Sequence, residues 1–265
     1  MAIQSVVLVR EVWDTRDLVG AVLDDRQTVN EGALATRFEP QDLNALELAL
    51  RLKDDHGGTV TAMAAGTPRD VDVLRECLYR GVDSVRRIDA DPRVLDTQAL
   101  AHLFAQAIRN AGDVDLILTG MTLIEDENSL LGPHVAAQLG ARQLTYVDDI
   151  DALGDGTVVG KRSIEMGYEY VEVSLPAVLS VGVALVEDDP RTPRTAKAML
   201  KLKAKKIEIP VMSAADLGTP DPTTLCTTDV AAHEAVEERV IESTVVDPES
   251  EDALKRMLAE VLKGE

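Results

Sequence analysis

The sequence contains no apolar run near the roughly 18 residues that a membrane-spanning helix needs, so we expect no direct membrane insertion. Its first twelve residues lack the basic start and cleavage site of a signal peptide. The only two cysteines, Cys77 and Cys226, lie far apart and match no disulfide framework or zinc pattern. Together these absences predict a cytoplasmic protein.

Residues that usually carry catalysis are also scarce. The four histidines, at positions 56, 102, 134 and 233, have no metal-ligand spacing, so we expect no metal site. There is no Ser–His–Asp signature and no context for a cysteine nucleophile. We therefore predict no catalytic residues. Whether the chain takes part in an enzyme remains uncertain at this point.

Basic residues are few compared with acidic ones. The chain of 265 residues has 27 Lys and Arg against 47 Asp and Glu, which gives a net charge of −20. Such a charge would repel nucleic acid and anionic lipid, so neither is expected as a main partner. Aromatic residues make up only 3% of the chain. The length suits one large α/β domain or two smaller ones.

Short apolar runs alternate with helical patterns through the first 147 residues. Runs at 6–9, 59–64, 84–88, 114–120 and 143–147 predict strands, and the segments at 40–56, 70–80, 96–111 and 133–139 predict helices. This alternation predicts an α/β fold with a mostly parallel, doubly wound, Rossmann-like sheet. In such sheets ligands bind at the carboxyl ends of the strands, so the loop after Gly120 is the candidate site. The loop contains neither a Walker sequence nor GxGxxG, and it could be only a connection.

After residue 149 the pattern changes. Alternating residues predict an antiparallel hairpin that turns near Met166 and Gly167, and the run 176–186 predicts a buried strand. Seven basic residues then fall within the 16 positions 191–206. In so acidic a chain, this stretch could equally form a surface that docks a partner or a face that is exposed only to solvent. We expect residues 1–210 to form the nucleotide-binding core. Residues 211–265 are expected to form an extended arm whose terminal helix packs on a partner subunit.

Several segments, in this order and spacing, give the chain a resemblance to the β subunit of electron transfer flavoproteins. The resemblance extends from about residue 3 to the end, and it rests on VREVWDT at 9–15, PQDLNALELALRLKDDHGGTVTAMAAGTP at 40–68, LRECLYRGVDS at 74–84, LPAVLSV at 175–181, DPRTP at 189–193 and LKAKKI at 202–207. Each segment alone is weakly specific. The details at Asp14-Thr15, Gly132-Pro133 and 145–147 are similar to the electron-bifurcating type of this family.

The resemblance implies an adenine-nucleotide α-hydrolase-like core and a heterodimer with an electron transfer flavoprotein α subunit. That subunit would hold most of the redox FAD, and this chain would hold AMP or a second FAD. Electrons would pass between flavins from a dehydrogenase, of the acyl-CoA dehydrogenase type, to a further acceptor. Carried over by position, the cofactor-binding residues are Val9, Thr15, Ala65, Gly66, Gly120, Asp126, Ser129, Leu130, Leu131 and Gly132.

The resemblance also implies a surface that docks the dehydrogenase. The partner-docking residues would be Arg191, Arg194, Thr195, Met199 and Leu200. Two positions depart from the family pattern. Leu130 and Leu131 replace side chains that can form hydrogen bonds, and Thr195 stands where an anchoring leucine is expected, so Met199 or Leu200 would have to anchor instead.

We therefore predict that the chain is an electron-carrier subunit. The sequence does not decide whether it also takes part in electron bifurcation. Two alternatives use the same core. One is a non-redox regulatory protein that binds an adenine nucleotide, and the other is a stand-alone enzyme of adenylate or pyrophosphate chemistry.

Overall fold

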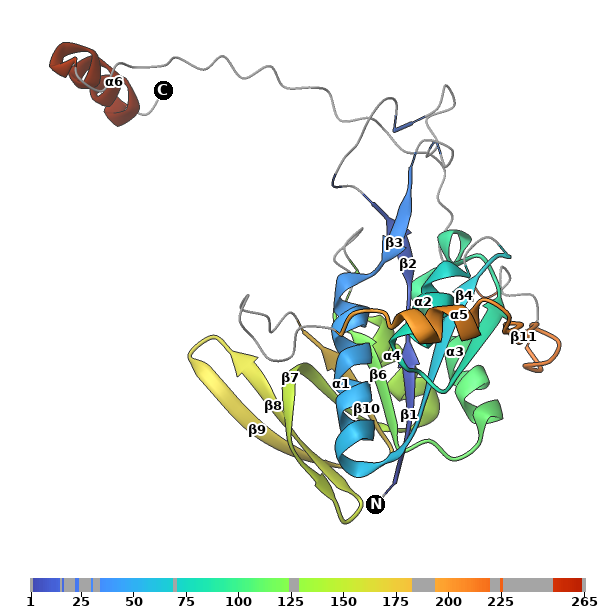
Figure 1. Cartoon of the computed structure of the whole chain (residues 1–265). Helices are drawn as coiled ribbons and strands as arrows, with labels where there is room; N and C mark the ends of the chain where they lie inside the picture. The colour runs from blue at the N-terminus through green and yellow to red at the C-terminus, as the bar shows by residue number, and fades with distance from the viewer. Residues whose placement is uncertain are drawn as a thin grey trace.

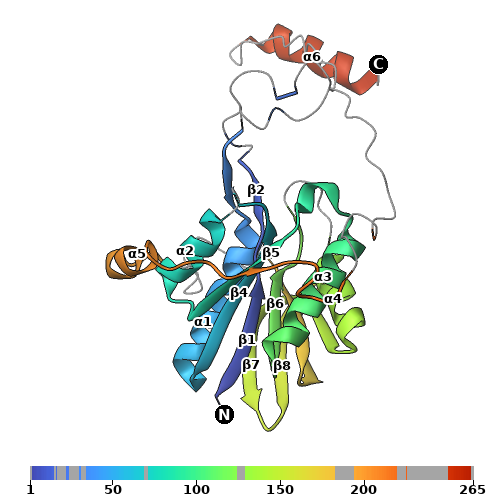
Figure 2. The ribbon, with the colours of Figure 1, turned by 90° about the vertical axis from the view of Figure 1, so that its right-hand side faces the viewer.

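The computed structural model of the chain describes residues 2–14, 16, 22–23, 30, 34–68, 71–123, 129–182, 194–219, 225 and 250–263. Within these ranges the chain forms an α/β fold with one large sheet between two layers of helices (Figures 1 and 2). Among the described helices, none is both long and apolar enough to cross a membrane.

In the described part of the chain the large sheet has nine strands, in the order β11-β5-β4-β1-β6-β10-β7-β8-β9. Their bounds are β1 Ile3–Leu8, β4 Gly58–Gly66, β5 Ser84–Asp89, β6 Leu116–Gly120, β7 Arg142–Gly154, β8 Thr157–Ile164, β9 Gly167–Ser174, β10 Ala177–Val181 and β11 Val211–Met212. Pairing is parallel from β11 to β7 and antiparallel from β7 to β9. The predicted α/β class with a mostly parallel sheet is confirmed.

The helices cover both faces of the parallel strands, as Figure 2 shows. One hydrophobic core lies under α1 (Pro40–His56), α2 (Asp72–Arg80) and α5 (Ala198–Ala204). The other lies under α3 (Thr97–Ala111) and α4 (Leu131–Leu139). Because both faces are covered, every residue of β6 and β10 is buried, which explains why these strands read as continuous apolar runs.

The start and end signals of α1 follow the sequence closely. Pro40 occupies the first turn, where its missing N–H costs nothing, and the Glu39 carboxylate accepts a hydrogen bond from the Gln41 N–H. The helix ends at His56, and Gly57 follows with a φ of 75°. These are the bounds that the sequence predicts.

Strands β7, β8 and β9 form an antiparallel extension that projects to the lower left in Figure 1. The predicted turn near Met166 and Gly167 is confirmed, since β8 ends at Ile164 and β9 begins at Gly167. Strand β7, however, continues to Gly154 instead of ending at 147. Its acidic residues obscured this in the sequence, and they are tolerated because one face of the extension meets solvent.

Smaller elements complete the described chain. A separate two-stranded ribbon pairs β2 (Glu11–Trp13) with β3 (Thr36–Phe38), and η1 (Pro92–Val94) precedes α3. Strand β10 ends at Val181, earlier than the predicted limit of 186, and residues 183–193 lie outside the described ranges. Val211 and Met212, which the sequence places at the start of the arm, pair with β5. Helix α6 (Glu251–Lys263) stands apart from the sheet in both views.

Candidate functional site

The carboxyl ends of β4, β1 and β6 lie side by side and bring four predicted site residues to one edge of the sheet. Ala65 and Gly66 end β4, Gly120 ends β6, and Val9 follows β1. The Val9 N–H donates to the Met63 carbonyl at 2.9 Å, which extends the pairing of β1 with β4 by one residue. This edge therefore offers small side chains and closely spaced backbone, as a nucleotide site in a parallel sheet requires.

Asp42, from the first turn of α1, joins the elements at this edge. Its side chain is fully buried and forms an ion pair with Arg10, from Arg10 Nε to Oδ2 at 2.9 Å and from Nη2 to Oδ1 at 2.8 Å. The backbone N–H groups of Arg10 and Gly120 donate to the same two oxygens at 2.8 and 2.7 Å. Four donors thus compensate the charge of one buried carboxylate.

Gln41 and Arg10 extend this network to the loop that follows β6. The Gln41 side chain accepts a hydrogen bond from the Thr122 N–H at 2.9 Å and donates one to Thr122 Oγ1. Arg10 Nη2 donates to the Thr122 carbonyl at 3.2 Å. These contacts fix the first residues after Gly120. Sequence reasoning missed Arg10, Gln41, Asp42 and Thr122, because polar residues in a first helical turn are common and their long-range partners leave no local pattern.

A buried arginine holds the end of β4. Arg87 lies on β5, and its Nη1 donates to the Gly66 carbonyl at 2.5 Å and to Asp89 Oδ1 at 2.6 Å. The Arg87 side chain is only 7% exposed. The position of Gly66 is therefore set by a charged side chain from the neighbouring strand as well as by strand pairing.

Helix α4 begins close to the same edge. A Cβ atom at Gly132 would overlap Ser180 Oγ of β10 and would meet Thr119 Cγ2 of β6 at 3.0 Å, so the backbone of the first turn lies almost against the sheet. Among the described residues, no side chain caps this helix at Leu130. The first N–H groups of a helix attract anions, and this end is suitably placed to bind a phosphate.

The other predicted residues of this loop differ in exposure. Leu131 is buried in the core under α3 and α4, Ser129 is half-buried and Leu130 is exposed. Leu131 therefore packs in the interior, while Leu130 faces outward. Thr15 and Asp126 lie outside the described residues, as does the whole of the acidic stretch 124–128.

The basic segment forms a second candidate surface, which we name the docking segment (residues 194–204). Thr195 and Met199 are exposed, Met199 to 72%, while Leu200 is half-buried and Arg194 turns inward to form ion pairs. Leu202, which the sequence did not single out, is 69% exposed. Leu202 could have been predicted from the sequence because it lies on the same short helix as Met199. Arg191 lies outside the described residues.

Comparisons with known proteins agree with this architecture. A family model described as "Electron transfer flavoprotein domain" matches residues 27–217. "Electron transfer flavoprotein subunit beta" of Megasphaera elsdenii is 34% identical over 226 residues, which cover 82% of this chain and 81% of the relative. "Protein FixA" of Azorhizobium caulinodans is 33% identical over 224 residues, covering 82% and 77%. "Acryloyl-CoA reductase electron transfer subunit gamma" of Anaerotignum propionicum is 34% identical, covering 66% and 65%.

Proposed function

Because the chain belongs to the electron transfer flavoprotein family and is an electron-transfer subunit of that family, we propose that it relays electrons within a heterodimer. Its partner would be the family's α subunit. The electrons would come from a dehydrogenase, of the acyl-CoA dehydrogenase type, and pass to a further acceptor. The names of the relatives support this, since they describe β subunits and an electron transfer subunit of a reductase. The non-redox regulatory alternative is not favoured.

A cofactor that is a flavin or a related nucleotide is expected throughout this family. We propose that this chain holds AMP or a second FAD at the carboxyl edge of β4, β1 and β6, while the α subunit holds most of the redox FAD. One observation carries this proposal: Val9, Ala65, Gly66 and Gly120 lie at one edge, and the first turn of α4 lies against β6 and β10 beside it. The apolar part suits an adenine ring, and the helix start suits a phosphate.

The chemistry of electron transfer would belong to the bound flavin, and the protein would position it. In this chain Asp42 and Arg10 hold the loop after Gly120 in place, and Arg87 holds Gly66. None of these groups needs to exchange a proton during turnover.

We also propose that the docking segment receives the dehydrogenase, with Met199 and Leu202 as apolar contacts among lysines. The exposure of these two side chains supports the proposal. In the arm, the exposed Met257 and Leu258 of α6 would pack on the α subunit. A cytoplasmic location is in keeping with the free, buried thiol of Cys77.

The test is to co-express the chain with the α-type subunit, purify the complex and quantify the nucleotides extracted from it. One FAD and one AMP per heterodimer is the result expected of a plain carrier, and two FAD is the result expected of the bifurcating type. A complex with a single FAD and no other nucleotide would overturn the proposed site. A chain that binds neither partner nor flavin would overturn the electron-transfer function itself.

A further inference from the structure

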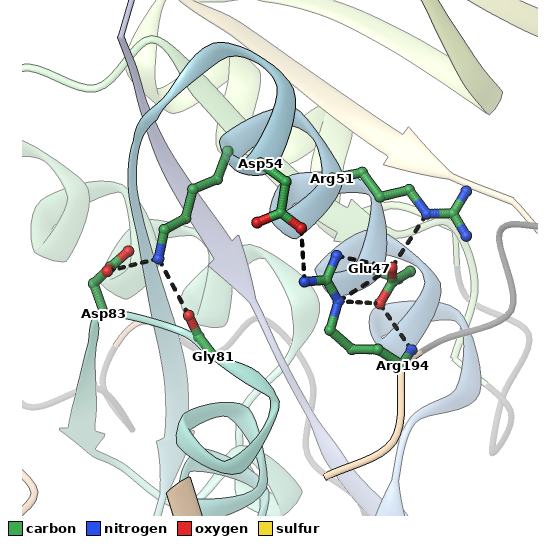
Figure 3. A network of polar contacts seen from close by, with 7 residues as sticks. Glu47, Arg51, Asp54, Gly81, Asp83 and Arg194 are labelled. Atoms are coloured by element: carbon green, nitrogen blue, oxygen red, sulfur yellow. Dashed lines mark hydrogen bonds and ion pairs between the residues drawn. The ribbon is translucent and has the colours of Figure 1, made fainter. Parts of the chain in front are cut away.

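Arg194 fastens the start of the docking segment to α1, although the two are far apart in the sequence. The Arg194 Nε donates to Glu47 Oε2 at 3.0 Å, and Nη2 donates to Glu47 Oε1 at 3.1 Å, so the ion pair is bidentate (Figure 3). The backbone N–H of Arg194 donates to Glu47 Oε2 as well, at 2.9 Å. Glu47 therefore holds both the side chain and the main chain of this residue.

The burial of Glu47 makes this contact stronger than an ordinary surface ion pair. The Glu47 side chain is only 6% exposed, and Arg51, one turn further along α1, donates to it at 3.1 Å. Arg194 Nη1 reaches a second carboxylate, Asp54 Oδ2, at 2.9 Å. The hydrogen bonds to Glu47 raise the pKa of Arg194 further above its usual value. Paired in this way, Arg194 is held in one geometry, since the planar guanidinium matches the carboxylate.

Further contacts hold the remainder of the segment on α2. Arg80 donates to the Arg194 carbonyl, and the Lys197 N–H donates to the Tyr79 carbonyl at 2.9 Å. At the far end, Arg75 donates to the Ala204 carbonyl at 3.1 Å. The backbone is thus attached at 194, 197 and 204, whereas the side chains from Thr195 to Met199 remain exposed.

We infer that Arg194 is a positioning residue that holds the docking segment, through Glu47, in the arrangement in which an electron-donating protein meets it. The inference rests on the proposed function, because the donor is what the segment would receive. A segment ordered in advance loses less conformational entropy when the donor binds. The contact between Arg194 and Glu47, which we call the clamp, therefore raises the affinity for the donor without touching the flavin. Loss of the clamp should weaken donor binding and leave flavin chemistry unchanged.

The test compares four forms of the complete flavin-loaded complex: wild type, Arg194→Met, Arg194→Lys and Arg51→Met. Arg51→Met is the matched control, because it also removes a cation from Glu47 but leaves the docking segment attached. Amide hydrogen exchange is followed at Lys197 and Lys201, whose N–H groups are bonded in the structure. Steady-state kinetics are measured with a purified acyl-CoA dehydrogenase, kept reduced by its acyl-CoA substrate, as the electron donor.

For Arg194→Met we expect exchange at Lys197 to rise about tenfold or more, since a charge-assisted pair is lost. The KM for the donor should rise by roughly the same factor while kcat and flavin content stay unchanged. Arg194→Lys, which keeps the charge but not the bidentate geometry, should lie between wild type and Arg194→Met. Arg51→Met should match wild type in both measurements.

Unchanged exchange in Arg194→Met would overturn the inference, as would faster exchange together with an unchanged KM. A fall in kcat or flavin content would also overturn it, because Arg194 would then act on the flavin site. If the dehydrogenase reduces none of the four forms, the proposed donor is wrong and the inference fails with it. If only the role of Arg194 is wrong, the dehydrogenase still reduces the wild-type complex.

Discussion

Asp42 carries a negative charge at a position without solvent exposure, and the energetic consequences are large. Its two oxygens accept hydrogen bonds from the Arg10 side chain and from two backbone N–H groups. A buried ion whose partner is removed keeps its desolvation cost but loses its compensation. The same residue thus supports stability and shapes the candidate nucleotide edge.

We expect Asp42→Asn to lower the free energy of unfolding by about 3 kcal/mol, because it removes the buried negative charge that accepts hydrogen bonds from Arg10 and Gly120. Denaturant unfolding measures this difference. Asp55→Asn is the control, since Asp55 lies exposed on the same helix and should change stability little. Equal stability of the two variants would contradict the account of Asp42 given above.

Individual site residues were predictable from the sequence only in part. Val9, Ala65, Gly66 and Gly120 came from the family resemblance, and the structure places all four at one edge. The polar residues that fix that edge were missed. Asp42 and Glu47 both look like ordinary acidic residues of a helix, and their partners Gly120 and Arg194 are 78 and 147 positions away. Periodicity reports which way a residue faces, and it does not report a distant partner.

At the scale of elements, the approach of α4 to the sheet depends on the absence of a side chain at Gly132. A methyl group there would overlap Ser180 and press on Thr119. The start of α4 would have to move away from β10, and the N–H groups that we assign to phosphate would move with it.

We therefore expect Gly132→Ala to lower stability by about 1–3 kcal/mol and to reduce the nucleotide content of the purified complex. Extraction of nucleotides and thermal unfolding are measured on the same sample. Gly154→Ala serves as the control, since a Cβ at Gly154 meets no described atom within 4 Å. Full nucleotide content in Gly132→Ala would show that the helix start is not the phosphate site.

The sequence predicted the existence of most elements better than their order in the sheet. Helix α1 was correctly bounded because proline and glycine mark its ends. The apolar run of β10 was recognised as a buried strand, but its place between β6 and β7 was not. Strand order is decided by long-range pairing, which a local pattern does not encode.

At the scale of the whole molecule, the distribution of charge is uneven. The chain carries a net charge of −20, yet seven basic residues fall within positions 191–206. In the described part of this stretch, Lys197, Lys201, Lys203, Lys205 and Lys206 are all exposed. A positive patch on an acidic protein attracts an acidic partner to that one face of the molecule.

We expect the second-order rate of reduction by the donor dehydrogenase to fall roughly tenfold between low salt and 0.5 M salt, because salt screens steering between exposed charges. Stopped-flow measurement of flavin reduction at several salt concentrations gives the dependence of the rate on salt. The double variant Lys203→Gln/Lys206→Gln should weaken this dependence, whereas Lys255→Gln on α6 should not. A salt dependence that is the same in all three proteins would contradict steering by the lysines of the basic stretch 191–206.

The position of β10 has a consequence for how the protein is made. β10 lies between β6 and β7, but the ribosome completes β7, β8 and β9 before it. Until β10 emerges, β6 and β7 each lack one of the strands with which they pair in the finished sheet. The Ser180 side chain that lies against α4, and the Val181 carbonyl that receives the Met121 N–H, arrive only with this strand. A nascent chain therefore lacks these two contacts until β10 has been made, and we expect cofactor loading to follow the synthesis of β10.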